Sequence, residues 1–210
     1  MVTFASGSIL GDGREGNGGN MAKTGERKSQ ILQTLAAMLE NPKGERVTTA
    51  LLAARLDVSE AALYRHFASK AQMFEGLIEF IEQTVFTLVN KIQVEEKDAL
   101  KQVESTIATL LGFAQKNPGM TRVLIGDALV NEDERLQARV NQLIDRLEAS
   151  VRQSARLAVS DGSLPADWEV NAYANAVIAF VIGRWHQFAK SGFKKTPLEG
   201  WPQQWRVFAA

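Results

Sequence analysis

The chain has 210 residues, 45% of them hydrophobic, and its 24 Lys and Arg balance its 24 Asp and Glu. This length suits one compact unit or two small domains, and the apolar content suffices for a core. The lack of cysteine excludes disulfides and thiolate chemistry, and two histidines offer little for a metal site. Because no run of eighteen apolar residues occurs, we expect no membrane span and a cytoplasmic protein.

The chain begins with a segment that differs in composition from the rest. Residues 1–20 are rich in Gly and Asn and are expected to form a disordered leader, because they bury too little apolar surface to offset the entropy of ordering. A first helix is expected over residues 23–40, where apolar residues recur at helical spacing. It ends at the run Asn-Pro-Lys-Gly over residues 41–44. The basic residues at its start either contact DNA phosphates or form a solvated face.

Residues 47–70, VTTALLAARLDVSEAALYRHFASK, have the pattern of a helix-turn-helix. Thr48 is a good N-cap, and leucines follow it at helical spacing. Asp57 tolerates the left-handed backbone of a tight turn, and Ser59 is expected to cap a second helix over residues 60–66. On the pattern alone, an ordinary pair of short core helices remains the alternative.

The outward residues of the second helix are small or polar, which favours entry into the major groove of DNA. Residues 21–70 carry eight Lys or Arg against five Asp or Glu, whereas residues 71–210 carry fifteen against seventeen. Positive charge therefore gathers on the segment, and we predict that it binds double-stranded DNA. The residues predicted to contact DNA are Thr48, Thr49, Ser59, Ala61, Ala62, Tyr64, Arg65, His66 and Lys70.

Two body helices follow, each with one anomalous feature. Ser69 and Gln72 have the spacing of a capping box, which starts a helix expected to reach residue 92. Its core stripe includes Leu88, while Phe80 lies roughly 115° from the centre of that stripe. The next helix, over residues 96–116, contains Gly112, which costs about 1 kcal/mol relative to Ala. The off-stripe Phe and the Gly either pack against neighbouring helices or serve a binding partner.

The last two long helices are expected over residues 132–158 and 167–190. Apolar residues of the former follow the 3.6-residue period, and the latter is apolar nearly all round. A four-helix bundle with two helices from each subunit would bury both, and burial within one chain is the alternative. We expect a homodimer. The residues predicted at its interface are Leu143, Leu147, Val177, Phe180 and Val181.

The run LAARLDVSEAALYRHFASKAQMF resembles the DNA-binding segment of TetR-family regulators, with a small residue at Ala53, an aromatic at Tyr64 and then Phe-Ala-Ser-Lys. Asp57 stands where the family usually has Gly. The resemblance covers roughly residues 24–205 and is strongest for the branch that acts in nucleoid occlusion. It implies an all-α, TetR-like fold with an N-terminal three-helix, helix-turn-helix DNA-binding domain at 21–70. A C-terminal helical dimerisation and regulatory domain would occupy 71–210.

In that branch, the helices corresponding to residues 69–92 and 96–116 carry a groove that binds the division protein FtsZ. The resemblance therefore implies a nucleoid-associated dimer on a palindromic DNA site that engages FtsZ and blocks septum assembly over the chromosome. Leu88 and Thr109 depart from the branch, which usually has Arg and Leu there. The positions carried over for FtsZ are Phe80, Leu88, Thr109, Gly112, Lys116 and Asn117.

The sequence offers no pattern typical of an enzyme. It has no G-x-S-x-G elbow, no phosphate loop after a strand, and no His and carboxylates at ligand spacing. We therefore expect no catalysis, cofactor or metal. The alternative function is that of a ligand-responsive transcriptional repressor, the usual role in the TetR family. Phe113, Met120 and Trp168 either line the cavity that it would need or fill the core, and no small-molecule ligand is expected.

Overall fold

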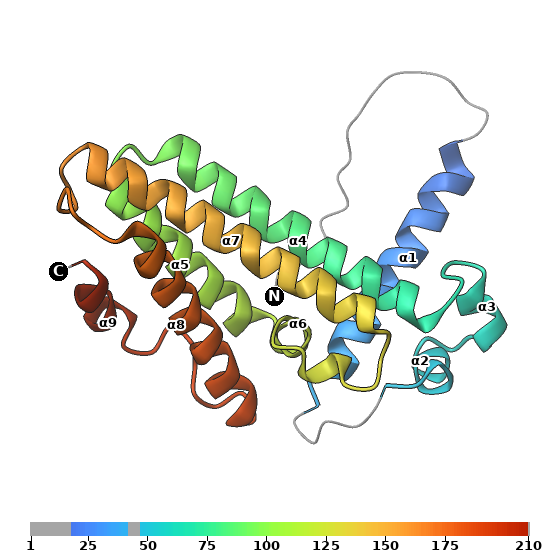
Figure 1. Ribbon diagram of the computed structural model, residues 1–210. Helices are drawn as coiled ribbons and strands as arrows, with labels where there is room; N and C mark the ends of the chain where they lie inside the picture. Colours follow the sequence, from blue (N-terminus) through green and yellow to red (C-terminus); the bar gives the residue numbers. More distant parts are fainter. Residues whose placement is uncertain (1–17, 42–46, 210) are drawn as a thin grey trace.

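The computed structural model describes the backbone of residues 18–41 and 47–209, and the side chains of these ranges from Gly25 onward. Over these residues the regular structure is entirely helical, in agreement with the predicted all-α fold (Figure 1). The elements are α1 (Gly18–Leu39), α2 (Thr49–Arg55), α3 (Glu60–Tyr64), α4 (Lys70–Glu95), α5 (Ala99–Lys116), α6 (Pro118–Leu124), the 3-10 turn η1 (Asp127–Leu129), α7 (Glu134–Ser160), α8 (Val170–Lys190) and α9 (Trp201–Phe208).

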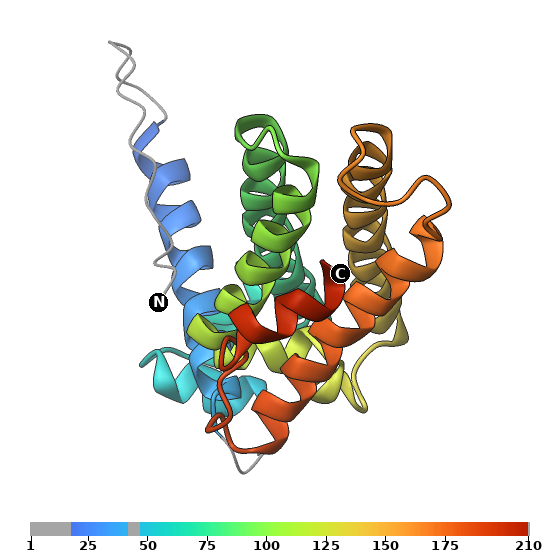
Figure 2. The ribbon, with the colours of Figure 1, turned by 90° about the vertical axis from the view of Figure 1, so that its left-hand side faces the viewer.

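Helices α1, α2 and α3 form a head at one end of the molecule, and α9 lies at the remote end of the body (Figures 1 and 2). Helix α4 begins in the head and runs beside α7 into the body. Helix α1 begins at Gly18, so residues 18–20 are helical and the expected leader is too long at that end. The remainder of that leader, residues 1–17, lies outside the described residues.

One hydrophobic core runs through head and body. It joins Leu35, Leu52 and Leu63 of the head to Phe74 and Leu77 of α4 and continues to Trp201 at the start of α9. In the body, the buried indole Nε1 of Trp185 donates a hydrogen bond to the carbonyl of Leu110 at 3.2 Å, which ties α8 to α5. No helix among the described residues is long and apolar enough to cross a membrane.

The predicted helices occur with shifts of a few residues at their ends, but one predicted core position is wrong. The side chain of Leu88 is 38% exposed, and Val89 takes its expected place in the core. Val89 lies four residues after the buried Val85, so the buried face of α4 continues at Val89 and not at Leu88. Leu88 is thereby left on the surface, where it becomes available to a partner.

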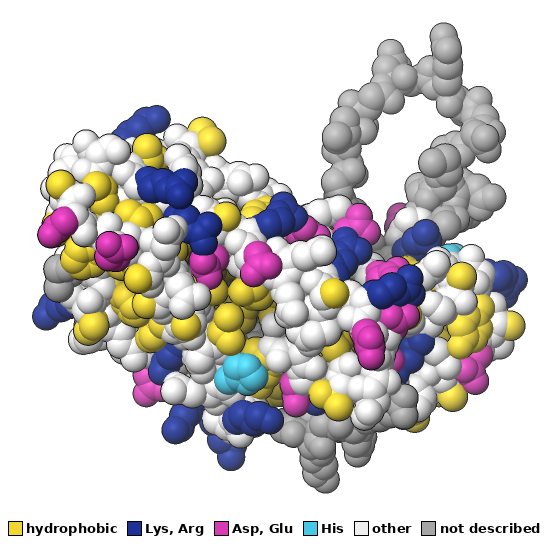
Figure 3. Space-filling model, viewed as in Figure 1, with side chains coloured by type: hydrophobic (Ala, Val, Ile, Leu, Met, Phe, Trp, Pro, Cys, Tyr) yellow, Lys and Arg dark blue, Asp and Glu magenta, His cyan; other side chains and the backbone are white. Residues whose placement is uncertain are grey.

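The predicted dimer contacts stay a prediction, and four of the five are buried within the single chain. Helix α5 packs against both α7 and α8, so that the apolar stripes of these two helices are covered within one chain. Phe180 is half-buried and packs on the rings of Trp201 and Phe208, with centroids 5.9 and 5.1 Å away. Hydrophobic side chains nevertheless gather on the outer surface over α7 and α8 (Figure 3). The predicted interface residues that are at most 2% exposed in the single chain are Leu143, Leu147, Val177 and Val181.

A close helix contact between head and body involves Gly119. A Cβ added there would lie 2.0 Å from the backbone oxygen of Ala36, so α1 and α6 approach each other with no room for a side chain. We expect Gly119→Ala to lower the free energy of unfolding by about 2 kcal/mol, because backbone would have to move. The control is Gly25→Ala in α1, where a Cβ meets nothing within 4 Å. It should stabilise by about 0.5–1 kcal/mol. Urea unfolding of both variants checks this, and equal effects would contradict it.

Candidate nucleic-acid interface and partner groove

The turn between α2 and α3 is built from backbone hydrogen bonds and one left-handed residue. The amide of Val58 donates to Ala53 O at 3.0 Å, and that of Asp57 donates to Ala54 O at 3.2 Å. Asp57 has φ 53°, the conformation predicted for it. These two bonds satisfy carbonyls that the end of α2 would leave unpaired. The tight turn is thus made with Asp, one of the few residues besides Gly that tolerate this backbone.

Two predicted caps fix the starts of the helices. Thr48 Oγ1 accepts from Leu51 N at 3.2 Å, and Ser59 Oγ accepts from Ala62 N at 3.3 Å. Between the two helices, Thr49 Oγ1 donates to the carboxylate of Glu60 at 2.6 Å. The N-terminal ends of α2 and α3 are therefore held side by side, as a helix-turn-helix requires.

The side chains predicted to contact DNA are mostly accessible. Tyr64 is 44% exposed, and Arg65 is the exposed C-cap of α3, which ends earlier than predicted. His66 lies beyond the helix and is half-buried, and its Nδ1 has no hydrogen-bond partner among the described residues. The exposed members of the set are Thr48, Ser59, Ala61, Tyr64 and Arg65, and the half-buried members are Thr49, Ala62, His66 and Lys70.

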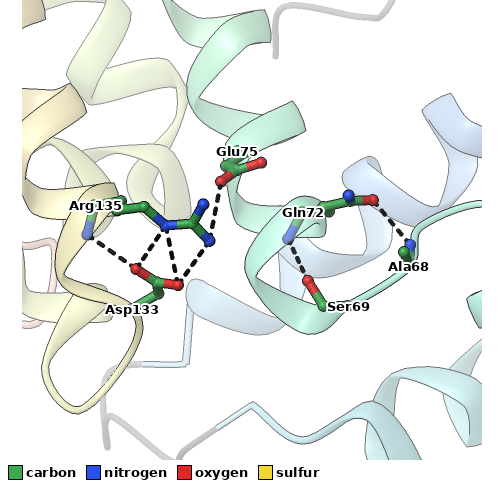
Figure 4. Close-up of polar contacts among 6 residues, drawn as sticks. All are labelled: Ala68, Ser69, Gln72, Glu75, Asp133 and Arg135. Atoms are coloured by element: carbon green, nitrogen blue, oxygen red, sulfur yellow. Dashed lines mark hydrogen bonds and ion pairs between the residues drawn. The ribbon is translucent and has the colours of Figure 1, made fainter.

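Lys70 lies at the start of α4 and is already paired. Its ammonium group forms an ion pair with Glu132, which precedes α7, and lies 5.6 Å from the centroid of the Phe74 ring. Beside it, Ser69 Oγ accepts from Gln72 N at 3.2 Å, as predicted (Figure 4). The side-chain amide oxygen of Gln72 in turn accepts from Ala68 N at 2.9 Å. A DNA phosphate at Lys70 must therefore compete with the carboxylate of Glu132.

A row of ion pairs joins α4 to α7 on the C-terminal side of Lys70. The Arg135 guanidinium donates to Asp133 at 2.8 Å and lies 3.9 Å from Glu75 (Figure 4). The side-chain hydrogen bond from Arg135 lowers the pKa of Asp133 to about 2. Further along, Glu82 pairs with two arginines of α7, Arg139 and Arg146. The helix that carries the head is thus held in place along α7.

A surface groove of about 400 Å³ lies between α4, α5 and the segment that precedes α9. A Cβ built on Gly112 would have Leu198 Cδ1 as its nearest neighbour, at 3.7 Å, which places Leu198 directly across from that glycine. Four of the six FtsZ-binding positions that the family resemblance implied line this groove. Leu198 lines it as well, and no sequence pattern indicated this. The lining residues are Leu88, Ala108, Thr109, Gly112, Phe113, Lys116 and Leu198.

The remaining two partner positions do not line the groove. Phe80 is half-buried and packs against the core. Asn117 is 6% exposed, and its Nδ2 donates to Phe113 O at 2.7 Å, which holds the end of α5. The ring of Phe113, which also lines the groove, is buried. Lys116 is exposed and lines the groove, where it supplies the charged group.

A second hollow of about 560 Å³ lies at the start of α8 and is lined by Trp168 and Tyr173. Their rings meet edge to face, with centroids 5.8 Å apart. Trp168 Nε1 and the Tyr173 hydroxyl are buried without a hydrogen-bond partner among the described residues, and burial raises the pKa of Tyr173. Met120 and Phe113, the other candidates for a ligand cavity, are buried and fill the core. Within the described ranges, no group of three or more His, Asp or Glu could hold a metal ion.

Two family patterns match the chain. That of bacterial regulatory proteins of the tetR family matches residues 36–77, which span the helix-turn-helix. That of the SlmA-like tetracyclin repressor-like C-terminal domain matches residues 97–210. Together they cover α2, α3, the start of α4 and the body from α5 onward.

Curated relatives agree with these matches. The chain is 51% identical over 188 residues to the nucleoid occlusion factor SlmA of Alteromonas mediterranea, covering 89% of this chain and 95% of that protein. It is 49% identical over 187 residues to SlmA of Marinomonas sp. (strain MWYL1), with the same coverage of both chains.

Solved structures share the fold at low sequence identity. The fatty acid degradation regulator FadR from Bacillus halodurans superposes with a TM-score of 0.73 at 11% identity, covering 88% of this chain and 95% of that one. The TetR-family regulator PfmR from Thermus thermophilus gives 0.72 at 19% identity, covering 86% and 97%. With the helix-turn-helix, the two family matches and relatives near 50% identity, the chain belongs to the TetR family, in the branch of the SlmA nucleoid occlusion factors.

Proposed function

We propose that this protein is a nucleoid occlusion factor that binds a palindromic DNA site as a homodimer, engages FtsZ while on DNA, and blocks septum assembly over the chromosome. The observation that carries the proposal is the combination of two surfaces in one chain. An open helix-turn-helix lies at one end, and the groove around Gly112 lies on the body. The name of the relatives supports the same function.

In the proposed DNA complex, α3 enters the major groove with Ala61 and Arg65 toward the bases. Tyr64 and Lys70 hold phosphates and fix the register. The small side chain of Ala61 permits close approach, and the symmetric dimer contacts half-sites roughly 34–36 Å apart. On binding DNA, Lys70 gives up its ion pair with Glu132 and forms one with a phosphate. Its contribution to the binding free energy is therefore the difference between these two ion pairs.

The role of Lys70 can be tested in a double variant that also replaces Glu132, so that no buried carboxylate is left without its ion-pair partner. We expect Lys70→Ala/Glu132→Gln to weaken binding to all DNA sequences alike and to lower the slope of log K against log salt by about one. Glu132→Gln alone should keep that slope and bind more tightly, because Lys70 loses its competing partner. Fluorescence anisotropy over a salt series measures both, with Lys97→Ala, at the exposed turn before α5, as control. A change in sequence preference with an unchanged slope would refute the phosphate role.

The proposed dimer uses the outer face of α8. Ala172, Ala176, Ala179 and Gly183 recur on that face at helical spacing. A Cβ added to Gly183 would meet nothing within 4 Å, so the chain itself leaves this face uncovered. Small residues let two helices approach closely, and we propose that the two-fold axis lies perpendicular to α8, so that the paired α8 helices are antiparallel. This face replaces the buried stripes as the proposed contact.

Engineered cysteines test the dimer, since the chain has none of its own. In the antiparallel pairing that places small residues together, Gly183 lies opposite Ala172 of the second copy. A mixture of Ala172→Cys and Gly183→Cys should therefore cross-link on mild oxidation. Each variant alone should not, because like positions lie roughly 16 Å apart along the helix axis. Cross-linking of Ala172→Cys with itself would contradict the antiparallel arrangement. Light scattering should report twice the 23.1 kDa chain mass.

The proposed FtsZ site is the groove around Gly112. Leu88 offers an exposed apolar contact, Gly112 lets a peptide backbone approach, and Lys116 attracts an acidic tail or a terminal carboxylate. Phe80 and Asn117 do not line the groove, since one packs on the core and the other caps α5. Leu88 and Thr109 make this groove less basic and less bulky than that of the branch.

Gly112→Ala is the cleanest test of the groove. The new Cβ would lie 3.7 Å from Leu198, an ordinary contact, so the fold tolerates it while a bound backbone does not. We expect Gly112→Ala and Lys116→Glu each to weaken binding of an FtsZ C-terminal tail peptide about tenfold or more, with dimer, DNA affinity and unfolding midpoint unchanged. Lys101→Glu, an exposed charge reversal at the start of α5, is the matched control. Parent-like binding by both groove variants would refute the site.

A ligand-responsive repressor is the second candidate, and one observation favours it. The hollow at Trp168 and Tyr173 has two buried polar atoms without a described partner. Mapping of bound sites across the genome separates the two functions. Many scattered sites support occlusion, whereas one or two promoter sites support a local repressor.

A further inference from the structure

The segment between α8 and α9, residues 191–200, is held by one side chain of α8. The Arg184 guanidinium donates from Nε to Pro197 O at 3.1 Å and from Nη2 to Thr196 O and Glu199 O, both at 2.9 Å. A planar guanidinium presents its donors in a fixed fork, which a lysine ammonium lacks. Three carbonyls on either side of Leu198 are therefore fixed relative to α8.

The segment is also fixed where it leaves α8. Gly192 and Phe193 both have φ 64°, an unusual backbone for a residue with an aromatic side chain. The Phe193 amide donates to Phe188 O at 2.9 Å, and the two rings meet edge to face with centroids 5.1 Å apart. Ser191 Oγ accepts from the amides of Lys194 and Lys195. This strained backbone persists because hydrogen bonds and ring packing hold it at several points.

At its far end, the segment places Leu198 against the groove. Leu198 O accepts from Trp201 N at 3.1 Å, and the Trp201 ring packs beside Trp205 and Phe180. Leu198 is half-buried, lies across Gly112, and lines the groove opposite the two helices that form the rest of it. An apolar side chain that the fold holds at a groove rim, without covering it, is suited to contact a partner.

We propose that residues 196–199 are a third wall of the partner groove, with Leu198 as its contact residue and Arg184 as the positioning residue that holds it. The inference rests on the proposed function, whose tail peptide is the occupant. The tail's backbone crosses Gly112, and one of its apolar side chains is held between Leu88 and Leu198.

The charges at the groove favour an acidic occupant. Among its lining residues, the charged one is Lys116, and no carboxylate is included. Outside the lining, Lys195 and Lys194 precede Leu198 by three and four residues, so their Cα atoms lie within about 11 and 14 Å of it, and the exposed Glu199 follows it directly. A peptide with an apolar residue flanked by Asp or Glu matches Leu198 and the charge of Lys116.

The experiment compares Leu198→Ala, Arg184→Lys and Arg184→Ala with the parent for binding of the FtsZ tail peptide. Leu198→Ala should weaken binding about tenfold, because it removes an apolar side chain that lines the groove. Arg184→Lys keeps the charge but loses the fork, and should weaken binding less than Arg184→Ala does. In the Leu198→Ala background, Arg184→Ala should cost little more, because Arg184 acts through Leu198. Arg206→Ala, an exposed arginine of α9, is the control.

Limited trypsin digestion tests the positioning role without a partner. Cleavage after Lys194 or Lys195 should accelerate about tenfold or more in Arg184→Lys, because the segment opens more often. An unchanged cleavage rate overturns the role of Arg184. If the parent and Leu198→Ala bind the peptide equally while Gly112→Ala does not, the third wall is refuted and the groove stands. If the parent does not bind the peptide, the proposed FtsZ function itself fails.

Discussion

The packing of α4 into both halves of the molecule is the constraint on which the other features depend. Phe74 and Leu77 belong to the same continuous core as the buried leucines of the head, so head and body share one hydrophobic core. The ion pairs of Glu75 and Glu82 with α7 fix the rotation of α4 about its own axis. The direction in which α3 faces is therefore set relative to α7, which packs on α8, the helix proposed to form the dimer.

Local chemistry allowed the sequence to predict the head in detail. Thr48, Ser59 and Ser69 each carry an oxygen that satisfies an amide three residues later, and this depends on no distant contact. The left-handed turn at Asp57 is likewise a property of the residue and its nearest neighbours. The helices of the body were predictable from their apolar period because their lengths exceed several turns.

Features that depend on distant neighbours were not predictable in the same way. An apolar period shows which face of α7 or α8 is covered, but not whether α5 of the same chain or a second chain covers it. Leu143 and Val177 illustrate this, since both are buried within the single chain, where α5, α7 and α8 pack against one another. Leu198 reaches the groove from a distant part of the chain, far beyond Gly112, through bonds to a single arginine. No spacing rule connects such positions.

Helix α8 has a consequence for communication between the two proposed surfaces. Gly183, on the proposed dimer face, and Arg184, which holds the groove wall, are adjacent residues, and Trp185 bonds to α5 beside the groove. In the proposed dimer, a tilt of α8 on pairing would be transmitted to Leu198 through Arg184 and to α5 through Trp185. Thermodynamic linkage then requires that a bound tail tighten or loosen the pairing of chains by the same factor by which pairing changes the affinity for the tail.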